Sequence, residues 1–533
     1  MKKIFSLALA SVFVVGTLSA CTPAPTQPEV TPPPAATQGA GTTPTPTPPT
    51  PEPPAPEAAF GRGITVATQN EAPSIAPARH NAMAGGYKNL LTHNGLFRAC
   101  YSNLAQVPDL VASWEAISDT VFEFTIYEGI RFHNGDIMTA HDVAASLEYV
   151  RTTPDARSAH LSMDSWEVVD EHTIRIDTGE PNAMLLADLA HSGNFIMPMS
   201  LIEAGHDFNA QPIGSGPFVF EEWRFGDSLT FTAFEDYFDT ARSSHIEYIT
   251  WRIIPEGSSR TIALETGEAD FVVEVAFSDV PRLESDPNIT VFTRPGTGHN
   301  QLLLNTSLPI FENIHVRHAI DMAIDREAIV IAGFNGLAFP TSNQVPNVFD
   351  GVSNDNLRDF DPEGARALLA EHGINPAEIT FDIIADNEDR RRMGEVVQAN
   401  LAEIGIEVTL TMNDLATSLQ RMTDGDFEAA FAGFTSASLL GFMRAVLTTE
   451  PARENRSRID VPEINELVLA AVGIIDTDER NALLYQASAI ANEHTGLIPT
   501  HQVMIIRAFN ANLIAPEINA VGNMNFNTVF WAE

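Results

Sequence analysis

The chain has 533 residues, which is too long for one hydrophobic core, so we expect two or more domains. Its hydrophobic fraction of 44% excludes a wholly disordered protein. Its formal net charge is −40, and its lysines are Lys2, Lys3 and Lys88. Because a field of that sign repels nucleic acid and anionic membrane surfaces, neither is expected as a direct partner.

The first twenty residues have the pattern of an export signal. A positive start precedes the apolar run over residues 4–17, which is shorter than the ~20 residues that a membrane-spanning helix needs. The run ends in Leu18-Ser19-Ala20-Cys21, which resembles the lipobox of bacterial lipoproteins, where the cysteine is diacylated and becomes the new N-terminus. The alternative is an ordinary secretory signal with an incidental cysteine. We predict a signal peptide over residues 1–20 and lipidation of Cys21.

Residues 21–59 form a segment rich in Pro and Thr. The stretch PTPTPPTPEPP favours extended polyproline II and offers few amide donors for a helix or sheet. We interpret it as a semi-rigid spacer between a lipid anchor and a folded body; a ligand for an SH3-type domain is the alternative. No later run reaches membrane-spanning length, and Cys100 is expected to be a lone buried thiol.

The first half of the folded body reads mainly as strands. A strand is expected around Ile64, and VFEFTI, residues 121–126, alternates apolar and polar residues as a half-buried strand does. Thr139 and Asp142 are spaced as a capping box before an amphipathic helix. WEVVDEHTIRID reads as a hairpin, and IGSGPFVFEEWRFGDSLTFTAF as a turn followed by two strands.

A different pattern begins near residue 311. FENIHVRHAIDMAIDREAIVIAGF is a long amphipathic helical region, and DPEGARALLAEHGI is a further helix with Pro362 at an early position. FDIIAD reads as a strand, and DRRRMGEVVQANLAEIGIEVTLTM runs from helix to strand. This alternation indicates an α/β unit with parallel strands. Helices follow from PEINELVLA, and LIPTHQVMIIRAF returns as a strand.

Motifs for several catalytic classes are missing from the sequence. The chain has no G-x-x-x-x-G-K-[ST], no G-x-S-x-G and no H-E-x-x-H, and its fifteen histidines lack metal-ligand spacing. His133, within FHNGD, is the most tempting catalytic candidate, but we interpret this stretch as a turn fixed by Gly135 and Asp136. We therefore expect no enzyme activity, no cofactor and no metal site.

Several segments, in order and spacing, resemble the extracellular solute-binding proteins of family 5, the dipeptide-, oligopeptide- and nickel-binding components of ABC importers. FEFTIYEGIRFHNGDIMTAHDVAASLEYV is close to the family signature, and PDLVASWEAISD precedes it. GSGPFVFEEW resembles the Gly-Thr-Gly-Pro turn of the family, and VRHAIDMAIDREAIV resembles its Val-Arg-x-Ala-Ile motif. The similarity covers roughly residues 62–533.

The resemblance implies an α/β fold with two lobes, of the periplasmic-binding-protein type II or cluster C, which closes over one ligand. Lobe I would comprise residues 60–305 and 500–533, with an extra subdomain at about 95–212. Lobe II would comprise residues 306–499. The chain would cross between the lobes near Gln301–Asn305 and Leu497–Gln502. Ligand binding would exchange open and closed populations.

Three stretches are expected to contact the ligand. The first, which includes Glu71 and Ser74, follows the opening strand. The second precedes the first crossing, where glycines let the backbone approach a ligand closely, and the third follows the strand FEAAFAGF. The predicted ligand-binding residues are Glu71, Ser74, Gly298, His299, Asn300, Phe434, Thr435, Ser436, Ala437 and Ser438. His299 is the histidine to watch for contact with ligand or metal, although a structural role is favoured.

Two charged residues that bind a short peptide in similar proteins have no evident counterpart. In dipeptide- and oligopeptide-binding relatives an aspartate meets the free amino group of the ligand, a strong charge-assisted pair, whereas Ala437 stands at about that place here. In dipeptide binders an arginine for the ligand carboxylate precedes the helix that matches RRRMGEVVQA. An alignment shift of one residue would bring Asp386 or Arg390 into that role.

These features favour a lipid-anchored, monomeric binding component of an ABC importer, outside the cytoplasm. Its partners would be a peptide or other small solute and permease subunits with a separate ATPase. A blocked, longer or cyclic peptide, an oligosaccharide or a metal chelate remain open as ligands. The rival hypotheses are a sensor or adhesion lipoprotein without a transporter, and an enzyme that grew on this fold.

Overall fold

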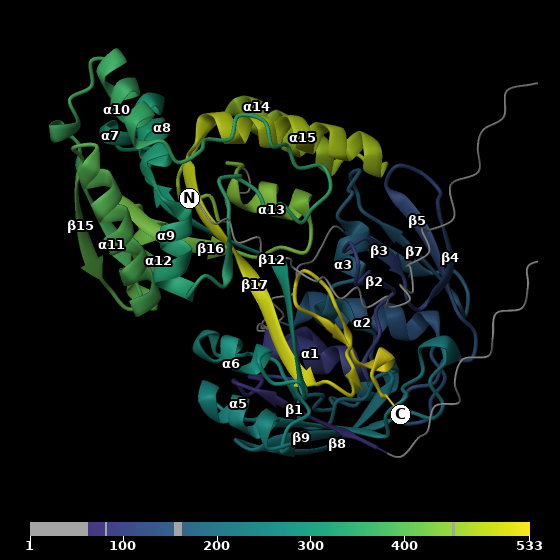
Figure 1. Ribbon diagram of the computed structural model, residues 1–533. Helices are drawn as coiled ribbons and strands as arrows, with labels where there is room; N and C mark the ends of the chain where they lie inside the picture. Colours follow the sequence, from purple (N-terminus) through teal and green to yellow (C-terminus); the bar gives the residue numbers. More distant parts are fainter. Residues whose placement is uncertain (1–61, 80–82, 154–162, 450–453, 533) are drawn as a thin grey trace, which may run out of the picture.

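The computed structural model describes residues 62–79, 83–153, 163–449 and 454–532 (Figure 1). The predicted signal peptide, Cys21 and the Pro-rich spacer therefore lie outside the described residues. Within these ranges, no helix is both long and apolar enough to cross a membrane.

One large mixed sheet runs through the whole molecule (Figure 1). Its strand order is β15-β14-β16-β12-β17-β11-β1-β10-β9-β8, and β13 also pairs with β17. The strands are β1 (Ile64–Thr68), β8 (Phe218–Arg224), β9 (Ser228–Ala233), β10 (Tyr248–Ile253), β11 (Phe271–Val272), β12 (Ile289–Leu304), β13 (Ala338–Pro340), β14 (Thr380–Ala385), β15 (Glu407–Met412), β16 (Ala429–Phe434) and β17 (Leu497–Asn510).

Strands β12 and β17 connect the two lobes. They pair antiparallel along most of their length, from Ile289 opposite Asn510 to Leu303 opposite Leu497, with irregularities between Pro295 and Gln301. One end of the pair packs in the cores of lobe I and the other in those of lobe II. The predicted boundaries at residues 305 and 500 remain predictions, but the change of cores lies along this pair.

Lobe I packs helices on both faces of strands β1 and β8–β11. The helices are α1 (Met83–Thr92), α5 (Gly257–Glu265) and α6 (Val280–Glu284). Helix α1 and the C-terminal segment cover one face, whereas α5 and α6 cover the other. That segment carries the short pairs β18 (Leu513–Ile514) with β21 (Phe530–Trp531) and β19 (Glu517–Ile518) with β20 (Met524–Asn525).

A separate four-stranded antiparallel sheet, β4-β5-β7-β6, forms the core of the predicted subdomain. Its strand β5 buries every second side chain, as the alternating sequence predicted. The predicted capping box is present, because the Thr139 N–H donates to Asp142 Oδ2 at 2.8 Å. The elements are β2 (Phe97–Ala99), β3 (Gln106–Pro108), β4 (Val111–Ala116), β5 (Val121–Ile126), β6 (Ser165–Val168), β7 (Thr173–Asp177), α2 (Ala140–Thr152), α3 (Leu185–Leu189) and α4 (Met199–Glu203).

Two residues near this subdomain bear on the sequence predictions. Gly135 has a φ of +90°, and His133 Nε2 lies 2.9 Å from the carbonyl oxygen of the distant Gly216, so FHNGD is a turn that contacts within the protein hold in place. Cys100 is fully buried, as expected, but it is disulfide-bonded. The expectation of a lone thiol at Cys100 is therefore wrong.

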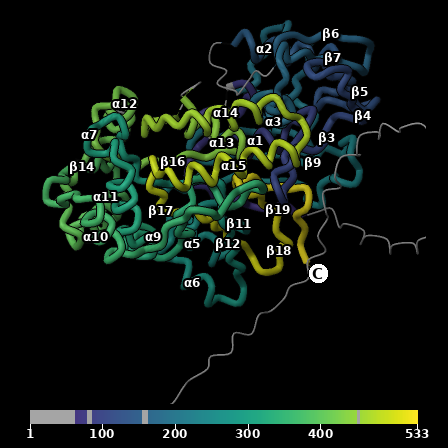
Figure 2. The backbone as a smooth tube through the Cα atoms, turned by 90° about the horizontal axis from the view of Figure 1, so that it is seen from above, coloured from purple at the N-terminus to yellow at the C-terminus, as the bar shows by residue number. Residues whose placement is uncertain are grey.

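Lobe II is an α/β layer structure with helices on both faces of β14, β15 and β16. Helices α8–α11 cover one face and α13–α15 the other, and Figure 2 shows α13–α15 side by side over the sheet. The predicted parallel pairing is present between β14 and both of its neighbours. The helices are α7 (Pro309–Glu312), α8 (Ile314–Ala323), α9 (Arg326–Phe334), α10 (Pro362–Glu371), α11 (Glu388–Glu403), α12 (Leu415–Asp424), α13 (Leu439–Val446), α14 (Pro462–Val472) and α15 (Thr477–His494).

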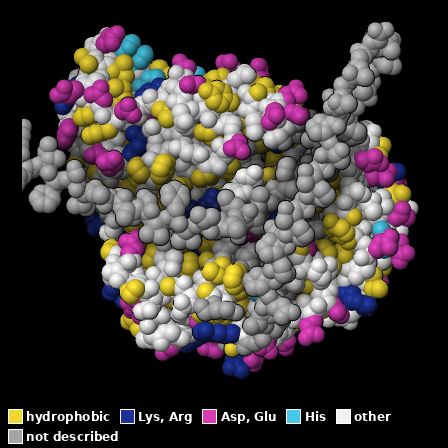
Figure 3. Space-filling view, turned by 45° about the vertical axis from the view of Figure 1, so that its right-hand side comes forward, with side chains coloured by type: hydrophobic (Ala, Val, Ile, Leu, Met, Phe, Trp, Pro, Cys, Tyr) yellow, Lys and Arg dark blue, Asp and Glu magenta, His cyan; other side chains and the backbone are white. Residues whose placement is uncertain are grey.

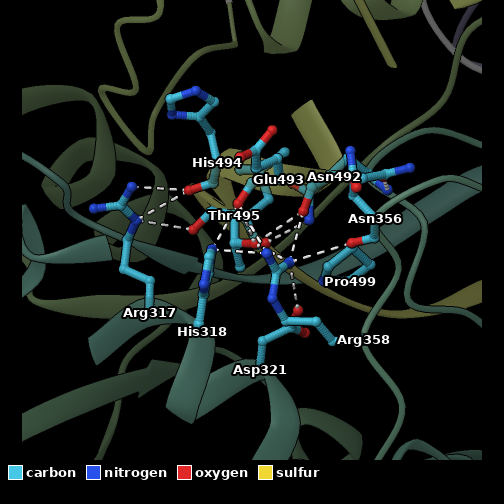
Figure 4. A network of polar contacts seen from close by, with 12 residues as sticks. Arg317, His318, Asp321, Asn356, Arg358, Asn492, Glu493, His494, Thr495 and Pro499 are labelled. Carbon is cyan, nitrogen blue, oxygen red and sulfur yellow. Dashed lines mark hydrogen bonds and ion pairs between the residues drawn. The ribbon is translucent and has the colours of Figure 1, made fainter. Parts of the chain in front are cut away.

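The VRHAIDMAIDR motif forms a polar network that holds the start of β17 (Figure 4). Arg317 donates at 2.7–3.2 Å to the carbonyl oxygens of Phe311, Glu312, His494 and Thr495, and so caps the end of α15. The buried carboxylate of Asp321, in the next turn of α8, forms ion pairs with two further arginines, Arg326 and Arg358. The motif is thus explained by packing between α8 and the crossing strand.

The lobes also touch away from the crossing strands. In the segment that leads into α3, Ala183 N–H donates to the Val472 carbonyl oxygen at the end of α14, at 2.6 Å. Met184 packs against the lobe II core, and Ile475 of lobe II packs against the subdomain core. We call these four residues the bridge. In this structure the predicted subdomain therefore contacts lobe II.

Candidate functional site

The parallel strands of both lobes end toward the crossing pair. In lobe I, β1 runs parallel to β10 and β11, and β11 ends with Val272 opposite Ala508 of β17. In lobe II, β16 runs parallel to β14 and ends with Phe434 opposite His299 of β12. Ligands of open α/β sheets bind at the carboxyl ends of parallel strands. The topology therefore places a candidate site at the crossing, between the lobes.

A cavity of about 200 Å³ lies at this place. Its walls come from the end of α9, the start of α11, strand β16 and both crossing strands. It opens to solvent, since Asn387 and Asp389 are exposed and the Val503 side chain is 41% exposed. The lining residues are Asn300, Phe334, Asn387, Asp389, Arg390, Met393, Phe431, Ala432, His501 and Val503.

The cation of the cavity is Arg390, in the first turn of α11. Asn387 caps this helix by accepting the Arg390 N–H at 2.9 Å. The cap brings Asp386 and Arg390 together, with 2.5 Å between Asp386 Oδ2 and Arg390 Nη1. Because the Asp386 side chain is almost fully buried whereas that of Arg390 is partly exposed, the guanidinium is held in place and stays accessible.

His501 is the second polar group of the cavity. The residue is 1% exposed, and its ring packs 4.4 Å from that of Phe334, centroid to centroid. Burial, with the nearby His299 and Arg390, lowers the pKa of His501 to about 3, so the ring is neutral at pH 7. Nε2 has no hydrogen-bond partner among the described residues. A buried acceptor of this kind is unusual and indicates a missing donor.

The predicted glycine stretch is a strand and contacts protein. A side chain at Gly296 would meet the Val503 carbonyl oxygen at 3.0 Å, and one at Gly298 would meet the Val503 side chain at the same distance. The element that closely approaches these glycines is therefore strand β17. His299 is fully buried, and its ring nitrogens lie 3.1 Å from Gln301 Oε1 and 2.8 Å from the Asn343 carbonyl oxygen. Both nitrogens are thus occupied within the chain, whereas Asn300 lines the cavity.

The first predicted stretch lies after the carboxyl end of β1. Glu71 Oε1 accepts from Trp223 Nε1 at 2.7 Å and from the Gly226 N–H at 2.9 Å. Ser74 Oγ accepts the Ala76 N–H at 3.2 Å and is largely buried. These residues stand at the edge of lobe I that the topology assigns to the site, but they do not line the cavity.

The third predicted stretch, from Phe434 to Ser438, links β16 to α13. The Ser438 hydroxyl caps α13 by accepting the Gly441 N–H at 3.1 Å, and the Ser436 hydroxyl donates to the Ser438 carbonyl oxygen at 2.9 Å. Thr435 and Ala437 are exposed. Two of the small hydroxyl residues therefore shape a helix start, and Thr435 and Ala437 are left on the surface at the carboxyl end of the strand.

Of the ten cavity residues, the sequence predicted Asn300 and gave Arg390 only as an alternative; the other eight were missed, His501 among them. His501 carried a signal that was overlooked. It lies in the returning strand LIPTHQV, and the antiparallel crossing pairs it with Asn300, which was predicted. In the described residues, no group of three or more His, Cys, Asp or Glu is arranged to hold a metal ion.

Comparison with known proteins identifies the family. Residues 105–443, more than half of the chain, match the family described as bacterial extracellular solute-binding proteins, family 5. Heme-binding protein A of Haemophilus influenzae is 26% identical over 430 residues, which cover 74% of this chain and 78% of that protein. The glutathione-binding protein GsiB of Pectobacterium atrosepticum is 25% identical over 395 residues, 71% of this chain and 76% of its own.

The solved structures agree. The structure of HbpA2 from Haemophilus parasuis superimposes with a TM-score of 0.81 at 25% identity, over 89% of this chain and all of that one. The two-lobed α/β fold is therefore confirmed, and the similar proteins are binding proteins of transporters and not enzymes. A location outside the cytoplasm follows from the family. The chain belongs to family 5 of the bacterial extracellular solute-binding proteins.

Proposed function

We propose that this protein captures a peptide or peptide-like solute between its lobes and delivers it to the permease of an ABC importer. The observation that carries the proposal is a cavity at the crossing pair, lined by lobe II and by both crossing strands, in the direction in which parallel strands of both lobes run. That cavity holds a donor, Arg390, and an acceptor, His501, among apolar walls. Solute-binding sites are typically apolar pockets that contain a few polar groups.

The relatives support a peptide-like ligand but leave its chemistry open. The two relatives named above are called heme-binding and glutathione-binding. Ala437 and Thr435 at the end of β16 offer no carboxylate to a free amine. A peptide whose amine is blocked or distant therefore fits better than a free dipeptide, and an oligosaccharide or metal chelate is the alternative.

We further propose that the protein acts as a monomer held at the membrane by a lipid on Cys21. The apolar run before Cys21 and the Pro-rich spacer support this anchor, and an exposed, strongly acidic body fits a protein outside the cell membrane. Figure 3 shows acidic side chains spread over the visible face instead of gathered in one patch. A sensor lipoprotein without a transporter is the rival.

The experiment is identification of the bound solute. The protein is purified from its own host under native conditions, denatured, and the released small molecules are measured by mass spectrometry against a lobe II variant, Arg390→Met. A solute present with the wild type and depleted with the variant is expected. Calorimetry with that solute then measures the affinity, and deletion of neighbouring permease genes should stop its uptake. Release of no solute, together with uptake independent of the protein, would refute the proposal.

A further inference from the structure

The hydrogen bonds around His501 favour one of the two ring tautomers. The Thr500 hydroxyl donates to the Asn300 carbonyl oxygen at 3.0 Å, and a hydroxyl has one hydrogen to donate. The same oxygen lies 3.1 Å from His501 Nδ1. Both contacts form at once only when this oxygen accepts from an Nδ1–H group. In a neutral imidazole this leaves Nε2 unprotonated, as an acceptor without a donor on the cavity wall.

Arg390 supplies the opposite chemistry on the same cavity. A guanidinium carries five N–H donors, and the ion pair to Asp386 uses Nη1. The remaining walls are largely apolar, with Phe334, Met393 and Phe431 among them. Besides Asn300, Asn387 and Asp389, the cavity thus presents an acceptor, His501 Nε2, and a charged donor, Arg390, to whatever enters it.

Neither kind of ion matches both polar groups of the cavity. A carboxylate would be attracted by Arg390, but it would place its lone pairs against the lone pair of His501 Nε2, which costs the desolvation of both acceptors. An ammonium would meet the cation of Arg390, while the nearest buried carboxylate, Asp386, is already paired. Asp389, the other acid of the cavity, is exposed to solvent, where its charge is screened.

We infer that this cavity is a subsite for a neutral group that both donates and accepts hydrogen bonds, a carboxamide or a hydroxyl on a short apolar stem. The group donates to His501 Nε2 and accepts from Arg390, and the stem packs on Phe334 and Phe431. The inference rests on the proposed function, because it assigns the chemical class of one group of the solute that the lobes capture. It gives His501 the role of a specificity-determining residue.

The test is a titration of histidine-selectively ¹⁵N-labelled protein with butyramide, butyrate and butylammonium. Long-range ¹H–¹⁵N spectra report the tautomer of each ring. We expect His501 to be protonated at Nδ1 before addition, and its Nε2 signal to shift on addition of butyramide. The dissociation constant of butyramide should be about fivefold or more below those of the two ions, the difference that an unmatched buried polar group causes. His299, with both nitrogens occupied, is the internal control and should not shift.

Two variants complete the design. His501→Phe keeps a ring against Phe334 but removes the acceptor, so the preference for butyramide should vanish; His501→Gln keeps an acceptor and should retain part of it. Tightest binding of butyrate, an Nε2–H tautomer, or unchanged preference in His501→Phe would each overturn the subsite. If His501→Phe does not fold, the wild-type titration still decides.

The outcome is separable from that of the proposed function. Fragment binding needs neither uptake nor a captured solute. A co-purified solute whose addition leaves the His501 signal unmoved would overturn the subsite alone. Absence of any solute and of transporter-dependent uptake would refute the proposed function, whatever the titration shows.

Discussion

Lys88 is the lysine of the folded body, and its ammonium is buried without a hydrogen-bond partner among the described residues. It is 1% exposed and lies 4.1 Å from the centroid of the Trp251 ring. Burial lowers its pKa from 10.5 to about 7, although Glu274 and Glu71 oppose the shift. A cation–π contact compensates only part of the desolvation of an ammonium.

Because of Lys88, the free energy of unfolding should therefore increase with pH. The unfolded chain keeps the Lys88 proton up to about pH 10.5, whereas the folded chain releases it near pH 7. Between these values the unfolded state binds more protons, so the contribution of Lys88 to the free energy of unfolding increases with pH. Below pH 7 both states are charged and the cost of burial remains complete.

The variant Lys88→Met should remove this dependence. At pH 7 it should be more stable than the wild type, and the difference should shrink by on the order of 3 kcal/mol by pH 10, from the pKa difference. Urea unfolding of both proteins at pH 7, 8, 9 and 10 measures it. Because other groups titrate equally in both proteins, the difference isolates Lys88; a difference that stays constant over this range would contradict the prediction.

A second prediction at the scale of one residue concerns Ala437. The wild type should show no submicromolar affinity for a simple dipeptide, because Ala437 brings no carboxylate to the carboxyl end of β16. Ala437→Asp, at an exposed position, should strengthen dipeptide binding about tenfold through a charge-assisted pair. Calorimetry with one dipeptide measures both, and Ile117→Asp, which adds the same charge at an exposed position of the predicted subdomain, is the control. Submicromolar wild-type binding would show that another group reads the amine.

Single residues were the hardest feature to predict from the sequence. Ser436 and Ser438 are predicted ligand contacts, and in the structure their hydroxyls shape the start of α13. The apolar run LLGFMRAV after Ser438 carried that signal, since a serine before such a run is a typical helix cap. His299 and His501 could not be told apart, because the orientation of a ring depends on partners distant in the chain, such as Asn343.

At the scale of elements, Arg317 ties α8 to the end of α15. It is largely buried, and its guanidinium satisfies carbonyl oxygens at the ends of two helices. Arg317→Met should lower the free energy of unfolding by about 3 kcal/mol or more, because several buried acceptors lose a charged donor at once. Urea unfolding measures the loss.

Arg391 on α11 is the matched control. It forms ion pairs with Glu388 and Glu395 on an exposed helix face. Pairs of this kind contribute about 0.3–0.5 kcal/mol each. Arg391→Met should therefore change stability far less than Arg317→Met, and equal losses would show that the network of Figure 4 does not hold the crossing strand.

Elements with a local pattern were predicted well. Alternating burial marks β5, the capping box marks α2, and the helix–strand alternation gave the parallel pair β14 and β15. Strand β12 was missed, since Pro295, Gly296 and Gly298 are poor strand formers and suggest a turn. It is a strand because β17 pairs with it, and a partner two hundred residues away leaves no local signature.

At the scale of the whole molecule, the first question is how the body is held at the membrane. Cys21→Ser should release the protein into the medium, because a lipid on Cys21 is the proposed anchor and the described helices cannot span a bilayer. Fractionation of cells measures it. The mass of the mature protein reports whether Cys21 carries a lipid, and unchanged membrane retention of Cys21→Ser would contradict the anchor.

The second question is what holds the lobes together. The crossing strands link them at one place and the bridge at another, where Met184 and Ile475 each pack against the core of the opposite lobe. The crossing strands are covalent and persist in any arrangement, whereas the bridge exists only while the lobes touch. The bridge therefore acts as a differential contact that favours closure.

Met184→Lys should shift this balance toward the open form. Burying an apolar side chain of this size contributes on the order of 1.5 kcal/mol, so loss of the contact should lower the ratio of closed to open molecules about tenfold. Small-angle scattering without solute should show a larger radius of gyration than for the wild type. Ile117→Lys, on an exposed part of the same subdomain at 51% exposure, is the control and should leave the radius unchanged. An identical radius in Met184→Lys and the wild type would mean that the crossing strands alone set the angle between the lobes.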